Sequence, residues 1–261
     1  MDARQRIATP RLIGWDSRTD KLARIIPIPP PASADGSFLN DFALDMANGA
    51  FYIADFGHSA DGGAIVVVSA EDGNARRLLS GHSHTSAEDT PMVIDGRPVR
   101  SRSAEGEVTE PRVAINPITI DVLDQWVYFG AMHGTQINRI RTSDLLNPEL
   151  DEEALATRVE RFGEKPVSDG ISIDNAGNVY VTDVQASGIG VTRPDGQYTL
   201  LFSDREKLSW PDAISAGPDG AMYVAVNKLH RTPQLNAGAN ESEPPYYVVR
   251  FRPLAPVSVG R

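Results

Sequence analysis

Short apolar runs rich in Val, Ile, Tyr and Phe alternate along the chain with turns marked by Gly, Pro, Asn and Asp. One phrase recurs four times without gaps, starting at Asn40, Asn116, Ser168 and Pro211. In each copy a polar residue precedes a short apolar run, a turn follows, and a second apolar run carries a tyrosine. Each copy therefore predicts a β-hairpin.

The tyrosine stands at the same offset in all four copies, as Tyr52, Tyr128, Tyr180 and Tyr223. The interval between the first two is the longest because it contains a polar insertion, residues 81–112. This insertion predicts a long loop with one hairpin at Asp95–Gly96. Without it, the intervals approach the roughly 40–50 residues of a β-propeller blade, and the repeated tyrosines are expected to pack in the core.

Further apolar strands after each hairpin predict four strands per blade. The first hairpin, Leu12–Asp16 with Lys21–Ile26, predicts only half a blade, and Tyr246–Arg252 adds a third strand to the last. We expect one all-β domain over residues 1–261, of the six-bladed propeller class, covering about four to four and a half blades. On this interpretation the N-terminal blade or blades are missing, and the open edges favour association. An irregular ring of four or five blades is the alternative.

A helix between blades is predicted over residues 147–162, with Asn147 as its N-cap and Pro148 at its first position. Acidic residues occupy its first turn, and Gly163 follows its end. Trp126 and Trp210 are expected to pack in the core, like the repeated tyrosines.

Composition excludes several classes of protein. The chain of 261 residues has no cysteine, which rules out disulfides, thiol nucleophiles and zinc ribbons. Its net charge of −10 disfavours a nucleic-acid partner. The longest apolar run, Ala64–Val68, is far shorter than the roughly 20 residues of a membrane helix, so no membrane partner is expected. The opening residues also lack the apolar stretch of a signal peptide.

Several phrases resemble the major royal jelly protein and yellow protein family in its bacterial branch. They are PRLIGWD, LNDFALD, FYIADFG, YFGAMHGTQINRIRTSDLL, VSDGISID and WPDAISAGPDGAMYVAVNKLHR. The resemblance covers nearly the whole chain and implies a six-bladed propeller with a longer N-terminal part, secreted to the extracellular space or periplasm. It also implies one of several activities: binding of biogenic amines, action on dopachrome as an isomerase, or a nutritive or scaffold role without chemistry.

More distantly, the repeated phrase is similar to the senescence-marker and gluconolactonase propellers, which hold a divalent cation in the central channel. In those enzymes an Asn and an Asp that open inner strands ligate calcium together with a Glu. The resemblance transfers the first two roles to Asn116 and Asp169. It implies calcium or another divalent cation as cofactor.

Inner strands of propeller blades start at one face of the ring, so their leading polar residues are expected to meet at the mouth of the axial channel. These residues are Asn40, Asp41, Asn116, Asp169 and Asp212. Oxygen ligands from several blades suit calcium. The alternative is that these side chains cap nearby turns.

Other candidates follow the second strands. Asn227 and Leu229 correspond to ligand-contacting positions of amine-binding yellow proteins, where the second position is aromatic. His133 ends another second strand and is a candidate general base, with a locally bonded histidine as the alternative. His82 and His84 are spaced to share a metal, but two ligands alone are a weak signal in a polar insertion, which favours a solvated loop.

Two hypotheses for function follow, and the sequence leaves open whether the protein is an enzyme. In the first, the propeller binds a small polar or aromatic molecule non-covalently at the channel mouth, near Asn227, Asp212 and Asp169. In the second, it is a calcium-dependent lactonase-like hydrolase with metal at Asn116 and Asp169, the latter or His133 being catalytic.

Overall fold

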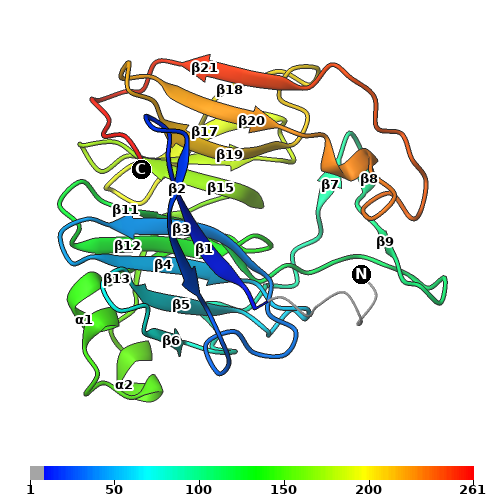
Figure 1. The fold of residues 1–261 in the computed structure, drawn as a ribbon. Helices are drawn as coiled ribbons and strands as arrows, with labels where there is room; N and C mark the ends of the chain where they lie inside the picture. The colour runs from blue at the N-terminus through cyan, green and yellow to red at the C-terminus, as the bar shows by residue number, and fades with distance from the viewer. Residues whose placement is uncertain (1–8) are drawn as a thin grey trace.

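The computed structural model describes residues 9–261, whose main sheets form four adjacent propeller blades (Figure 1). Blade 1 contains β3 (Leu39–Asp45), β4 (Ala50–Asp55), β5 (Ala64–Ser69) and β6 (Ala75–Leu78). Blade 2 contains β11 (Ile115–Ile120), β12 (Trp126–Ala131), β13 (Gln136–Arg141) and β14 (Glu160–Glu164). Blade 3 contains β15 (Ser168–Ile173), β16 (Val179–Asp183), β17 (Gly188–Thr192) and β18 (Tyr198–Ser203). Blade 4 contains β19 (Pro211–Ala216), β20 (Met222–Val226) and β21 (Tyr247–Phe251).

The four repeated phrases form the inner hairpins of these blades, which confirms the prediction from the sequence. Each pairs its first strand antiparallel to its second, as β3–β4, β11–β12, β15–β16 and β19–β20. The first strands are neighbours in space, because β11 contacts β3 and β15, and β15 contacts β19. The leading residues of all four repeats therefore start from one region around the axis.

A separate hairpin of β1 (Arg11–Asp16) and β2 (Lys21–Pro27) packs against blade 1. Ile26 on β2 is buried against Ile53 and Val66 of blade 1. On the same hairpin, Ile13 and Trp15 are 61% and 57% exposed. This two-stranded sheet confirms the predicted hairpin, and its place as half a blade stays a prediction. The described residues contain four blades and this hairpin. That the complete propeller has six blades stays a prediction.

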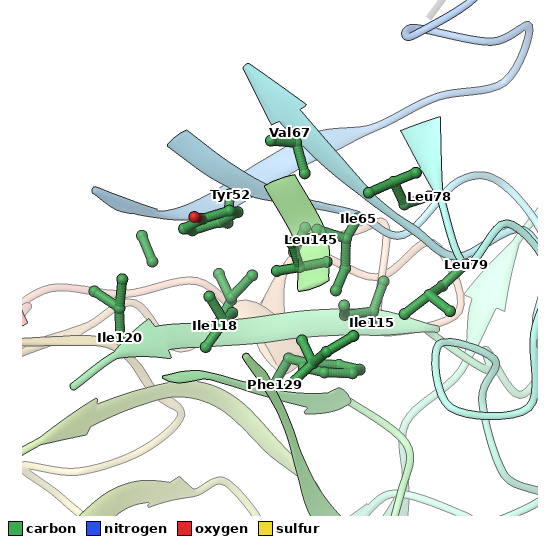
Figure 2. Close-up of a cluster of buried hydrophobic side chains, with 14 of the residues drawn as sticks. Tyr52, Ile65, Val67, Leu78, Leu79, Ile115, Ile118, Ile120, Phe129 and Leu145 are labelled. Atoms are coloured by element: carbon green, nitrogen blue, oxygen red, sulfur yellow. The ribbon is translucent and has the colours of Figure 1, made fainter. Parts of the chain in front are cut away.

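Apolar side chains between neighbouring blades hold the fold together. The largest of these clusters joins blades 1 and 2 (Figure 2), where Ile65 and Tyr52 lie opposite Ile118 and Phe129. All four residues are at most 5% exposed. Similar clusters lie between blades 2 and 3 and between blades 3 and 4. Burial at about 25 cal/mol per Å² of apolar surface makes these interfaces the main source of stability.

Tyr52, Tyr128 and Tyr180 are buried as predicted, whereas Tyr223 is only partly buried. Three of the four tyrosines also make a polar contact. The hydroxyl groups of Tyr52, Tyr180 and Tyr223 donate hydrogen bonds of 2.8–2.9 Å to Asp side chains in the turns of their own hairpins. The acceptors are Asp45, Asp174 and Asp219. A buried hydroxyl needs a partner, so the Asp and the Tyr form one unit in blade 1 and in blade 3.

The single helix predicted over residues 147–162 is wrong. Two helices of five residues replace it, α1 (Thr142–Leu146) and α2 (Glu152–Ala156), and Asp151 rather than Asn147 caps the second through the Ala154 amide at 2.8 Å. The segment that follows forms β14, because pairing with β13 places the Phe162 ring edge-on to Tyr128 at 4.9 Å. Strand pairing and this aromatic contact outweigh the local helix signals.

The insertion over residues 81–112 forms a hairpin of β7 (Val93–Ile94) and β8 (Arg97–Pro98) at the predicted turn. A second hairpin pairs β9 (Ser101–Arg102) with β10 (Val108–Thr109). β8 lies beside the loop containing the short helix η2 (Leu229–Arg231) of blade 4 (Figure 1), where the Ala237 amide donates to Arg100 O at 2.7 Å. The insertion, which follows blade 1 in the chain, thus contacts the loop of blade 4. Within residues 9–261, no helix has the length and hydrophobicity needed to span a bilayer.

Candidate functional site

Every inner hairpin has an irregularity at the same place, directly after the first paired residue of its inner strand. The register shifts between Leu39 and Phe42 in blade 1, and equivalent shifts occur in the other three blades. The residues inside these shifts are Asn40 and Asp41, Asn116 and Pro117, Asp169 and Gly170, and Asp212 and Ala213. A bulge releases side chains from the regular alternation of a strand and re-aims them. The repeated polar positions are therefore bulge positions.

These polar side chains line one cavity of about 520 Å³ at the start of the inner strands. It contains all five residues predicted to meet there: Asn40, Asp41, Asn116, Asp169 and Asp212. Such a volume lies within the range of small-molecule sites, which is about 300–1,000 Å³. The five residues come from four different blades, so only the assembled propeller creates this site.

A chain of hydrogen bonds crosses the floor of the cavity. The Asn40 amide donates to Asn116 Oδ1 at 2.7 Å, and the Asn116 amide donates to Asp169 Oδ1 at 2.6 Å. The Trp210 indole N–H donates to the other oxygen, Asp169 Oδ2, at 2.6 Å. Both oxygens of Asp169 are therefore held in place by N–H donors from two blades.

Trp210 has a role that its predicted place in the core did not include. It is buried, lines the cavity and positions Asp169, and its backbone φ of 61° lies in the left-handed region. A bulky residue adopts that conformation at a cost of about 1–3 kcal/mol, which the surrounding structure must offset. Such strain is typical of residues that are held in place for function.

Three carboxyl groups in the cavity have raised pKa values. Burial, followed by the charges of Asp212 and Asp41, raises the pKa of Asp169 well above its ordinary value, against the lowering effect of its hydrogen bonds. Burial raises the pKa of Asp212 as well, opposed by a hydrogen bond from Asn227. Burial and the charge of Asp212 raise the pKa of Asp41 to about 7. The described residues that line the cavity include no Lys or Arg to balance these carboxyl groups.

Replacing Asp41 by Asn is expected to weaken the pH dependence of stability. Because the folded pKa of about 7 exceeds the ordinary 3.8, the folded state holds a proton that the unfolded chain releases between these values. This contribution is complete below pH 4 and is lost as the pH rises through 7, at no more than about 1.4 kcal/mol per pH unit. Urea unfolding from pH 4 to 8 measures it. Asp35→Asn, at an exposed position, is the control, and an unchanged profile in Asp41→Asn would contradict the assignment.

The two candidates after β20 occupy different places. Leu229 lines the cavity, whereas Asn227 does not belong to its lining. The Asn227 amide donates a short hydrogen bond to Asp212 Oδ2, and its own oxygen accepts from the Leu229 amide at 3.1 Å. Asn227 therefore fixes Asp212 and Leu229 from behind rather than facing a ligand directly.

His133 also lines the cavity and is completely buried. Its Nδ1 accepts a hydrogen bond from the Val113 amide at 3.0 Å. Burial, with smaller contributions from Arg112 and Lys165, lowers the pKa of His133 to about 4. A proton acceptor near neutral pH needs a free nitrogen and a pKa close to 7, so these surroundings do not suit the predicted general base.

Lys165 gave no signal in the sequence. Its ammonium group is buried and donates to three main-chain oxygens, those of Met132 at 3.3 Å and of Gly134 and Pro166 at 3.0 Å. Burial lowers its pKa to about 7, although Glu88 and Asp183 oppose this effect. Lys165 thus anchors the segment after β12 that carries His133.

The wall of the cavity is apolar. Phe38 and Phe56 stack with their ring centroids 4.4 Å apart, and both line it. Met92 and Val99 come from the insertion, and Leu235 comes from the loop after η2. The phenylalanines flank the paired residues Leu39 and Asp55, so the register of the first hairpin could have identified this pair.

The predicted metal ligands Asn116 and Asp169 lie together, but their oxygens are already used. Asp169 accepts N–H groups at both oxygens, and Asn116 Oδ1 accepts from Asn40. Across residues 9–261, no group of three or more His, Cys, Asp or Glu side chains is arranged to hold a metal ion. His82 and His84 stack on each other with centroids 5.0 Å apart, outside the cavity.

The solved structures that resemble the chain in fold include the two that follow. One, a luciferin-regenerating enzyme, is 14% identical with a TM-score of 0.55, covering 96% of this chain and 75% of that one. The other, regucalcin from Agrobacterium tumefaciens str. C58, a calcium-binding protein, is 14% identical with a TM-score of 0.55, covering 94% and 72% respectively. Similarity at this identity establishes the propeller fold and no more.

A search of curated proteins gives no match to this sequence. The sequence model of the major royal jelly proteins, in contrast, matches residues 1–252, which is nearly the whole chain. The repeated phrases, the propeller blades and this match agree with one another. The chain belongs to the major royal jelly protein family.

Proposed function

We propose that this propeller binds a small organic cation with a flat apolar part, such as an aromatic amine, non-covalently in the cavity at the start of its inner strands. The observation that carries this proposal is the group of three carboxyl groups, Asp41, Asp169 and Asp212, in one partly apolar cavity. None of the described lining residues is Lys or Arg. A ligand cation would supply the missing countercharge.

The remaining lining residues suit the apolar part of such a ligand. The stacked Phe38 and Phe56 rings and the Trp210 indole provide flat surfaces. Aromatic faces bind both flat rings and cationic groups. Met132 and Leu229 add flexible apolar contacts. An anionic floor beneath an aromatic wall distinguishes amines from neutral and acidic molecules of the same size.

Calorimetric titration of phenethylamine at pH 8 tests the proposal. We expect Asp212→Asn to weaken binding about 10- to 100-fold, because a hydrogen bond to a charged group is replaced by one to a neutral amide. Affinity should rise as the pH increases through about 7, where the pKa of Asp41 lies and the floor becomes charged. The matched control is Asp219→Asn, which removes an exposed carboxylate of blade 4 paired with Arg250 and should leave the affinity unchanged.

The neutral analogue 2-phenylethanol separates charge recognition from simple apolar binding. It has the same ring and chain length but no ammonium group, so it should bind at least tenfold more weakly than phenethylamine. Equal binding of the two compounds, or equal affinity of the wild-type protein and Asp212→Asn, would show that the carboxyl groups do not select a cation.

A calcium-dependent hydrolase is the second candidate, because Asn116 and Asp169 lie in contact on neighbouring inner strands. As arranged, these side chains do not fit a metal, since each candidate oxygen accepts an N–H group. A cation would require the Asn116 amide to turn and Asp169 to lose a donor. Calcium content together with a calcium-dependent melting temperature decides the point. A stoichiometric, stabilising ion lost in Asp169→Asn would favour this second function.

A further inference from the structure

One ring nitrogen of His133 accepts a hydrogen bond, and the other has no partner within residues 9–261. It lies two residues beyond the end of β12, and its backbone is held on both sides. Its N–H donates to Val113 O at 3.1 Å, and its C=O accepts from the Glu88 amide at 2.7 Å. His133 thus lines the cavity from a segment that is held by main-chain hydrogen bonds on both sides.

The bond at Nδ1 determines the tautomer of His133. A backbone N–H can only donate, so the Nδ1 that accepts from Val113 carries no proton. In the neutral ring the proton is then on Nε2. Burial of the ring, followed by the charges of Arg112 and Lys165, lowers the pKa of His133 and so disfavours a second proton. His133 is consequently a hydrogen-bond donor at Nε2 and not a proton acceptor.

The Nε2 atom is buried and has no hydrogen-bond partner among the described residues. An unpaired buried donor costs about 1–3 kcal/mol, so such groups in native proteins generally have a partner of some kind. His133 lines the same cavity as the carboxyl groups of Asp169 and Asp212. The carboxyl groups suit the cationic end of a ligand, and the Nε2–H group suits a hydrogen-bond acceptor elsewhere in the same ligand.

We propose that His133 is a specificity-determining residue, whose Nε2–H donates a hydrogen bond to an oxygen acceptor of the ligand while the carboxyl groups bind the cationic end. This inference rests on the proposed function and narrows it to amines that carry a hydroxyl or carbonyl oxygen. The charge requirement and the oxygen requirement are separate, because they involve residues of different blades.

The tautomer can be tested without any ligand. In nitrogen-15 spectra of the histidine rings, His133 should show the Nε2–H form throughout pH 5.5–8, without titrating. The resonance is assigned by its loss in His133→Asn, and the chain has five histidines in all. A ring protonated on Nδ1, or one that titrates near pH 6.5, would overturn the donor role whatever the protein binds.

Three amines test the oxygen requirement: phenethylamine, tyramine and its meta-hydroxy isomer. We expect at least one hydroxylated amine to bind the wild-type protein about tenfold more tightly than phenethylamine. His133→Asn can still accept from the Val113 amide but lacks an atom at the Nε2 position, so it should reduce this ratio to about one. His84→Asn, outside the cavity, should retain the wild-type ratio.

The outcomes separate the two proposals. If no amine binds the wild-type protein, the proposed function fails and the role of His133 fails with it. If all three amines bind equally well, or if the hydroxyl preference survives in His133→Asn, only the role of His133 is overturned. Should His133→Asn not fold, the wild-type ratio and a shift of the Nε2 resonance on adding tyramine still decide the question, since an unshifted resonance contradicts the bond.

Discussion

Replacing Arg261 by Met is expected to lower the free energy of unfolding by about 3–5 kcal/mol, and the melting temperature by roughly 10 °C. The Arg261 guanidinium pairs with Asp124 at 2.6 Å and donates to Leu44 O at 2.9 Å. Both side chains of the ion pair are about nine-tenths buried. The main-chain oxygen of Arg261 also accepts hydrogen bonds from Ser172 and Ala216. One residue thus contacts all four blades, and removing its charge leaves the Asp124 carboxylate buried without a cation.

Chemical denaturation of the single and double variants measures this effect. Arg18→Met removes an arginine that is 91% exposed and pairs with Asp16, so it should cost no more than about 1 kcal/mol. Asp124→Asn introduced into Arg261→Met removes the uncompensated charge and should restore part of the stability. A loss below 1 kcal/mol in Arg261→Met would show that the pair does not hold the blades together.

Replacing Asp55 by Asn is expected to cost about 3 kcal/mol and to weaken amine binding. Asp55 is completely buried at the end of β4. Its Oδ1 accepts the amides of Phe38 at 2.6 Å and Gly57 at 3.0 Å, and its Oδ2 pairs with Arg77. The Asn side chain has a single acceptor oxygen, so at least one of these donors loses its partner. The backbone beside both Phe38 and Phe56 then loosens, and with it the aromatic wall of the cavity.

Unfolding in urea and titration with phenethylamine follow the two effects of Asp55→Asn separately. Glu160→Gln is the matched control, because it neutralises an acid that pairs with Arg139 at 2.8 Å but is half exposed. That change should cost less than about 1 kcal/mol and leave affinity unchanged. An Asp55→Asn protein with wild-type stability would contradict the structural role, and one with wild-type affinity would separate Asp55 from the cavity.

The inner hairpins could be predicted from the sequence because their signals are local. A turn, two apolar runs and a tyrosine at a fixed offset recur within each copy, and β-pairing of adjacent strands requires nothing more. The helix prediction over residues 147–162 failed for the opposite reason. There the segment containing Phe162 pairs with β13, and the Phe162 ring packs against Tyr128. A local pattern of caps and acidic residues carries no information about these contacts.

The candidate site was predicted in part. The polar positions Asn116, Asp169 and Asp212 could be placed at one channel mouth because equivalent repeat positions lie at one end of a propeller. Asn227 was expected to face the ligand, but it supports Asp212, since its orientation depends on the turn after β20. Trp210 had only a packing role in the prediction, yet its indole N–H holds Asp169.

The sequence alone determined the propeller class, the four inner hairpins and which positions lead the inner strands, because these follow from short-range periodicity and repetition. The tertiary structure decided which atoms of those residues are free. Asp169 and His133 both depend on hydrogen-bond partners more than 15 residues away, such as Asn116 and Val113. These partners decide whether Asp169 can bind a cation and whether His133 donates or accepts a hydrogen bond. Hydrogen-bond partners and burial set the charge and direction of each group, and only the packed blades supply them.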